Sequence, residues 1–193
     1  MTETITQDPA AFDVEGWLQD AKLPEESATV YKRADVVAEL SDLKRRIELE
    51  TRAAGAEYTA ADPALTPLEQ EYQKLLETFS RSALTVYVRA LTEQELRALR
   101  TASEAATKGL APDEQNEHFG YEILAKSITA VKAAGADRQS VVFTPAKVQA
   151  LKDAIGTAQM TVILNARLTA QNAVPNVDAD FLHKRSGTEP GAE

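Results

Sequence analysis

The sequence predicts a mostly α-helical fold with a small two-stranded β element, which is an α+β class. The segment Thr29-Val-Tyr-Lys-Arg-Ala34 returns 56 residues later as Thr85-Val-Tyr-Val-Arg-Ala90. Each copy begins as a β-rich run and continues with helical spacing, and such fixed-offset similarity is typical of a duplicated supersecondary unit. We therefore predict two related strand–helix units over 27-47 and 83-103, joined by a helical hairpin and followed by C-terminal helices over 117-172.

The first unit opens with a strand over 27-33, because Thr29, Val30 and Tyr31 favour a pleated surface. From Asp35 the apolar spacing becomes helical. The inner face of this helix would consist of Val36, Val37, Leu40, Leu43 and Ile47. Before the strand stands Trp17, the only tryptophan, which we expect to cap the core.

The second helix of the hairpin has a clear start signal. Thr66 is a suitable cap, Pro67 suits the first helical position, and Glu69 follows three residues after the cap. Its apolar stripe would be Leu68, Tyr72, Leu75, Leu76 and Phe79.

The second unit has its strand at 83-90, and Thr92 with Glu95 predicts a capping box for the helix that follows. Residues 109-116 read as a loop. The spacing of Tyr121, Leu124, Ile128 and Val131 predicts the next helix, closed by residues 134-137.

Thr144 and Pro145 open the last long helix, after an apparent extended link over 141-143. Its inner face would consist of Val148, Leu151, Ile155, Ala158 and Val162. Gly156 should destabilise this helix by about 1 kcal/mol relative to alanine. The β-branched residues 161-163 leave a strand as the alternative there.

Domain organisation follows from where these patterns begin and end. We predict a flexible N-terminus over 1-13, a single mostly helical domain over 14-182, and a disordered tail over 183-193. A two-stranded ribbon is barely stable alone, so we expect it to lie against helices or to pair with another chain.

Composition restricts the functions that the chain can have. The net charge is −9 and the isoelectric point about 4.9, so the surface repels nucleic-acid backbones and anionic membranes. The chain contains no cysteine, which excludes disulfides, thiolate metal sites and cysteine nucleophiles. The start of the chain carries no secretory signal pattern and the longest strongly apolar stretch is short, so we expect a soluble cytoplasmic protein.

Residues that could carry chemistry are few. His118 follows the acidic residues Asp113, Glu114 and Glu117. Two roles are possible for it, namely a ligand in a metal cluster or a polar histidine in a loop. The only other histidine is His183, beside two basic residues, and neither has the i, i+4 partner of helical zinc sites.

The remaining candidate residues are explained without any catalytic or metal-binding role. Asp178 and Asp180 are two residues apart and are expected to be solvated rather than to bind a metal. The chain has no glycine-rich phosphate loop and no nucleophile elbow. We therefore predict no catalytic residue, no cofactor-binding residue and no metal ligand, and hence a protein that is not an enzyme.

Basic residues stand out against this acidic background. Lys44-Arg45-Arg46 is read as a solvated helix face or as a docking spot for an acidic partner. Arg33 and Arg89 end the two repeated strands at equivalent positions, where each is expected to anchor its strand or to pair with a helix carboxylate. The face from Val148 to Val162 favours core over interface.

The order of short motifs resembles a known family. The series begins with Asp-Val-x-x-Trp-Leu at 13-18 and Lys22-Leu-Pro-Glu25, and continues with Val86-x-Val-Arg-x-Leu-Thr-x-x-Glu95. Three further segments follow, namely Ile123-Leu-Ala125, the Phe-Thr-x-x-x-Val-x-x-Leu of 143-151, and Val177-Asp-Ala-Asp-Phe181. Together these segments are similar to the tail assembly chaperones of tailed phages and prophages of actinobacteria. The turn after the first strand, Arg33 to Asp35, lacks the glycine expected of that group.

The resemblance implies a non-enzymatic role in virion morphogenesis in the host cytoplasm. Members of the group are thought to coat the helical tape-measure protein until tail-tube subunits polymerise around it. The implied partners are therefore the tape-measure protein and the tail-tube protein, with no nucleic acid, no membrane, and self-association left open. The alternative is a structural particle protein, either a head–tail connector or a minor tail protein, and a third reading is a small inhibitor of a host factor.

Overall fold

The computed structural model describes residues 13–19, 21–54 and 65–174. Helices dominate this part of the chain and four antiparallel strands form one small sheet, which confirms the predicted α+β class. The elements are α1 (Val14–Gln19), β1 (Glu25–Tyr31), the 3₁₀ helix η2 (Ala34–Val36), α2 (Val37–Ala54), α3 (Leu65–Arg81), β2 (Ala83–Arg89), α4 (Glu93–Ala106), α5 (Pro112–Ser127), β3 (Ile128–Ala133), β4 (Gln139–Ser140) and α6 (Pro145–Asn172).

The repeated strands β1 and β2 are antiparallel neighbours in the sheet, whose order is β1-β2-β3-β4. Thr29 lies directly opposite its own repeat, Thr85, and their hydroxyl oxygens are 3.1 Å apart. The two copies of the duplicated strand are therefore related by a local pseudo-two-fold axis at this threonine pair.

The prediction of two strands was incomplete, because β3 and β4 extend the sheet. The helix expected to run through Ile128 and Val131 ends at Ser127, and both residues belong to β3. Ile128 and Val131 continue the helical spacing of Leu124, but the stretch Ile-Thr-Ala-Val is rich in β-branched residues, which pack well in a strand. Over so few residues the two periods cannot be distinguished.

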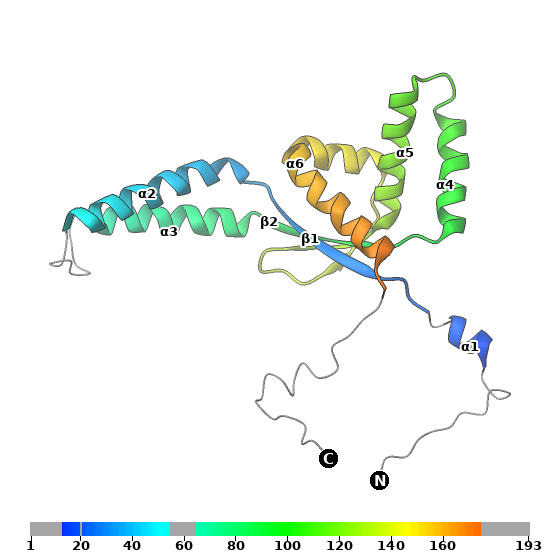
Figure 1. Cartoon of the computed structure of the whole chain (residues 1–193), viewed down its shortest axis with the longest axis horizontal. Coiled ribbons are helices and arrows are strands. Elements are labelled where there is room, and N and C mark those ends of the chain that lie inside the picture. The colour runs from blue at the N-terminus through cyan, green and yellow to red at the C-terminus, as the bar shows by residue number, and fades with distance from the viewer. Residues whose placement is uncertain (1–12, 20, 55–64, 175–193) are drawn as a thin grey trace, which may run out of the picture.

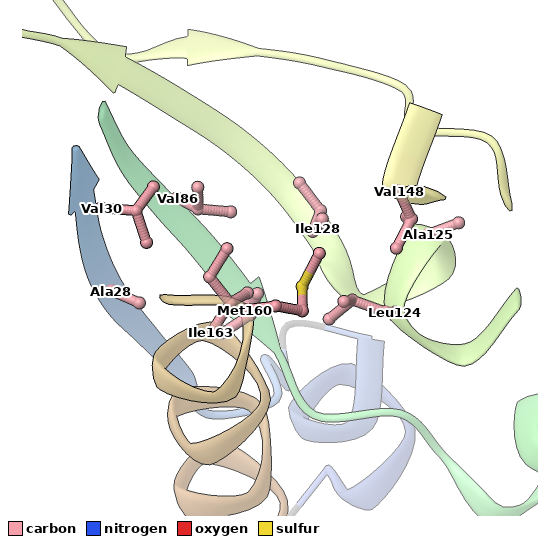
Figure 2. Close-up of a cluster of buried hydrophobic side chains, with 10 residues drawn as sticks. Ala28, Val30, Val86, Leu124, Ala125, Ile128, Val148, Met160 and Ile163 are labelled. Carbon is pink, nitrogen blue, oxygen red and sulfur yellow. The ribbon is translucent and has the colours of Figure 1, made fainter. Parts of the chain in front are cut away.

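The core lies between the sheet and α6, which crosses one face of β1 and β2 (Figure 1). Figure 2 shows strand and helix side chains meeting there, including Val30, Val86, Met160 and Ile163, all of them buried. At the edge of this layer the ring of Tyr31 stacks on Phe79 with centroids 4.1 Å apart, which joins α3 to the sheet.

Helix α6 also holds the ends of the repeated strands with two side-chain amides. Gln159 accepts from the backbone N–H of Tyr31 and donates to its carbonyl, at 2.6 and 2.9 Å. Gln171 makes the same pair of bonds to Leu91, both at 3.0 Å. Each amide thus takes the place of a neighbouring strand at one residue.

The predicted inner face of α6 holds only for its first half. Val148 is buried and Leu151 and Ile155 are half-buried, as expected, but Ala158 is exposed and Val162 is 47% exposed. The reason is Gly156, whose φ of 79° and ψ of 165° interrupt the helix. The second half begins with a new rotation and buries Met160, Ile163 and Ala170 instead; residues 161-163 are helical, so the strand alternative is wrong.

Two helical hairpins, α2–α3 and α4–α5, extend from the sheet in different directions (Figure 1).

The capping box at Thr92 and Glu95 is confirmed, and so is the Thr144 cap of α6. The expected loop over 109-116 is shorter, because α5 begins at Pro112. Its Glu114 carboxylate accepts from the N–H of Ala111 at 3.1 Å, a start signal that the sequence analysis missed.

Trp17 does not cap the core. It lies in α1, of which no residue is buried, and its side chain is 61% exposed. Val14 and Leu18 share its helix face and are exposed as well. This six-residue helix therefore presents an apolar face that the described residues do not cover.

Parts of the predicted domain organisation lie outside the described residues, namely 1–12 of the N-terminus and all of the tail 183-193. Among the helices that are described, none combines the length and the apolar character needed to span a bilayer.

Candidate partner-binding surface

The duplication leaves one apolar position covered in the first copy and open in the second. Leu43 and Leu99 are equivalent by the 56-residue offset. Leu43 is buried in the first unit, where α2 packs against α3 and η2. Leu99 is only half-buried, because α4 packs mainly against α5 and its other side faces an open groove.

This groove, which we call the α4–α5 groove, lies between α4, the end of α5 and the link into α6. Its volume is about 430 Å³. Most of its lining is apolar, contributed by Leu99, Ala102, Ala125, Ile128, Val141, Val142, Phe143 and Pro145. Val142 is 81% exposed and stands at the mouth of the groove.

Charged side chains stand at the rim of the α4–α5 groove. Lys126 lines it from α5 and is exposed, whereas the carboxylate of Glu122, which also borders the groove, is largely buried. Lys147 fixes the opposite side, since its Nζ donates to the carbonyl of Val142 at 3.2 Å. An apolar floor with lysines at the rim is suited to one face of an amphipathic helix that carries acidic residues beside its apolar stripe.

A second groove runs along the α2–α3 hairpin and has a volume of about 790 Å³. Most of the residues that line it are charged or polar, but their aliphatic stems, together with Ile47 and Tyr72, make most of its wall apolar. Lys44 of the basic run lines this groove, whereas Arg45 pairs with Asp42 at 3.2 Å. All three basic residues are exposed, which agrees with a solvated helix face.

His118 lies in α5 and not in a loop. Two of the acidic residues that precede it are engaged elsewhere, since Glu117 binds Lys152 at 2.8 Å and Glu114 caps its own helix. The Lys152 ammonium and the Tyr121 hydroxyl lower the pKa of Glu117. Across the described ranges no three histidine or acidic side chains lie close enough together to hold a metal.

Ser103 and Glu122 both approach His118, but not in a catalytic arrangement. The Ser103 hydroxyl is 3.3 Å from Nδ1 and the Glu122 carboxylate is 3.6 Å from the same nitrogen. A relay that activates a serine needs the hydroxyl at one ring nitrogen and the acid at the other. This cluster therefore lacks the geometry of a nucleophile site.

The two equivalent arginines have different partners. Arg89 holds Glu95 of α4 through two hydrogen bonds, of 2.6 and 3.0 Å, and lowers the pKa of that carboxyl to about 2. Arg33 instead binds Asp35 at 2.8 Å, and this exposed contact lowers the pKa of Asp35. Both contacts confirm the prediction that each arginine pairs with a helix carboxylate.

The candidates Asp178, Asp180 and His183 lie outside the described residues. Comparison of the chain with protein-family models, with curated proteins and with solved structures found no match.

Sequence reasoning did not find the α4–α5 groove. Two signals for it were present, namely the apolar run over 141-143 and the position of Leu99 in its helical stripe. What the sequence could not supply was their distance in space, because it depends on where α5 ends and β3 begins.

Proposed function

We propose that this protein is a phage tail assembly chaperone that binds helical segments of the tape-measure protein in the host cytoplasm. The sequence resemblance supplies the class of function. The structural observation that supports the proposal is the apolar floor of the α4–α5 groove, with charged side chains at its rim.

The groove fits the chemistry of such a partner. A long amphipathic helix exposes apolar side chains at every third or fourth position, and these must be covered until the helix is packed. Leu99, Val141 and Phe143 offer half-buried apolar contacts for such side chains. Lys126 can meet acidic side chains that flank the apolar stripe.

The small size of the groove is consistent with transient binding. A chaperone must release its client when the tail-tube subunits arrive, so its affinity must remain moderate. A groove of this volume covers only a few side chains of a helix, and small interfaces are typical of short-lived complexes. Several copies along one tape-measure protein would together provide the coating.

The proposal is tested by co-expression of this chain with the tape-measure protein of the same genome, followed by co-purification and a binding titration. Val142→Asp should weaken the complex at least tenfold, or about 1.4 kcal/mol, because it places a charge at the apolar mouth. Leu110→Asp is the matched control: Leu110 is also exposed but lies outside the groove lining, and binding should be unchanged. Equal binding by wild type and Val142→Asp, or no complex with wild type, would refute the proposal.

A further inference from the structure

Strand β1 is an edge of the sheet, and its backbone groups can be assigned a direction. The N–H of Ala90 donates to Pro24 and the N–H of Lys32 donates to Ser82, so the even positions of β1 face β2. Tyr31, at an odd position, is bonded through both groups to Gln159 on the outer side. The N–H and C=O groups of Glu25, Ser27 and Thr29 therefore point outward, where the described chain places no strand.

The duplication indicates that this edge can accept a strand. By the 56-residue offset, Ser27 and Thr29 correspond to Ala83 and Thr85 of β2. The same edge of β2 is paired with β3, where Thr85 stands opposite Lys132. The first copy of the unit has the same backbone edge, on which residues 13–19, 21–54 and 65–174 place no strand, up to the point where Gln159 closes it at Tyr31.

The open edge is self-complementary in one antiparallel register. With Ser27 opposite Ser27 of a second copy, Glu25 lies opposite Thr29, and all the outward groups of the three free positions find partners. A shift that places Glu26 opposite Glu26 brings like charges together, which destabilises a strand pair. Shifts in the other direction require the backbone of Tyr31, which Gln159 already occupies.

We propose that two copies of this chain pair through β1, antiparallel and with Ser27 at the two-fold axis, to form one continuous eight-stranded sheet. The partner is a second copy because this register pairs all three free positions of both strands and avoids the Glu26–Glu26 contact and the occupied backbone of Tyr31. Paired residues in antiparallel strands share a face, so the two α6 helices lie on the same side of the joined sheet. This inference does not depend on the proposed chaperone function.

The same pairing supplies a contact for α1. In an antiparallel pair, the residues before β1 of one copy run beside the residues after β1 of the other. There the second copy presents the start of α2, where Val37 is 45% exposed. The uncovered apolar face of Val14, Trp17 and Leu18 can therefore pack against the second copy.

Cysteine cross-linking tests the pairing and its register, because the chain has no cysteine of its own. In Ser27→Cys the two new thiols face each other across the axis, with Cα atoms about 5.5 Å apart, within the range that a disulfide spans. In the control Thr29→Cys the two thiols are offset by four residues, about 14 Å along the strand. Mild oxidation should convert Ser27→Cys to a covalent dimer and leave Thr29→Cys monomeric on a denaturing gel.

Sedimentation of the full chain provides the second measurement. The wild type should be dimeric, and Ser27→Pro should be monomeric with an unchanged circular dichroism spectrum, since the lost N–H has no partner within the monomer. Ser27→Ala keeps the N–H and should remain dimeric. A monomeric wild type, a dimeric Ser27→Pro, or cross-linking of Thr29→Cys in place of Ser27→Cys would overturn the inference.

Discussion

Gly156 determines the course of α6, the longest helix of the described chain. Its φ of 79° and ψ of 165° lie in a region that only glycine enters readily. The turn allows the first half of α6 to pack on α5 and the second half to cross the sheet. From the sequence alone, Gly156 predicts only a small loss of stability within one continuous helix. Helix propensity does not indicate that a position needs a backbone angle that only glycine adopts readily.

Replacing Gly156 by alanine should therefore lower the free energy of unfolding by about 1–3 kcal/mol, measured by chemical denaturation. The loss arises from the backbone, since a Cβ there would meet no atom within 4 Å. Gly120→Ala is the matched control, because this exposed helical position has equal space. It should stabilise the protein by about 0.5–1 kcal/mol. Equal effects of the two substitutions would contradict the assigned role of Gly156.

The ion pair between Arg89 and Glu95 makes stability depend on pH. The pKa of Glu95 falls from 4.5 to about 2 on folding, chiefly because of hydrogen bonds from Arg89. A lowered acid pKa contributes stability that is complete above pH 4.5 and is lost as the pH falls toward 2. The shift sets an upper limit of about 3 kcal/mol, and solvent screening of these quarter-exposed side chains reduces it to about 1–2 kcal/mol.

Denaturation curves collected between pH 5 and pH 2 test this assignment. The wild type should lose stability across this window more steeply than Glu95→Gln, which carries no titrating carboxyl at this position. Glu93→Gln is the control, since Glu93 pairs only with exposed Arg97. If Glu95→Gln keeps the full slope of the wild type, the stabilising carboxylate lies elsewhere.

At the scale of elements, α6 organises the sheet through Gln159 and Gln171. Each saturates both backbone groups of one residue at or just beyond a strand end, where Tyr31 is half-buried and Leu91 is buried. Sequence reasoning placed the helix correctly but could not find these bonds, since they join residues 80 and 128 positions apart.

Gln171→Ala should thus destabilise the protein by about 1–3 kcal/mol. Amide hydrogen exchange should show faster exchange of the Leu91 N–H, while the Tyr31 N–H remains protected by Gln159. Asn165→Ala, at an exposed position of the same helix, should have little effect on either amide. Unchanged protection of Leu91 in Gln171→Ala would show that this amide bond does not hold the strand end.

At the scale of the whole molecule, two copies of one strand–helix unit have taken different surroundings. The repeat predicted the two units and the class of the fold, because identical local patterns favour identical local structures. It did not predict β3, which pairs with only one copy. It also did not predict that Leu43 is covered while its equivalent Leu99 borders a groove, since that depends on the packing of α3 and α5. The surfaces that we assign to partners lie where the copies differ.

The chaperone proposal is tested most directly by quantitative peptide mass spectrometry of this chain in the lysate of phage-producing cells and in purified particles. We predict abundant peptides in the lysate and none above background in the particles, because an assembly chaperone leaves its client when the tube forms. A fixed number of copies per particle would contradict this account and identify the chain as a structural component of the virion.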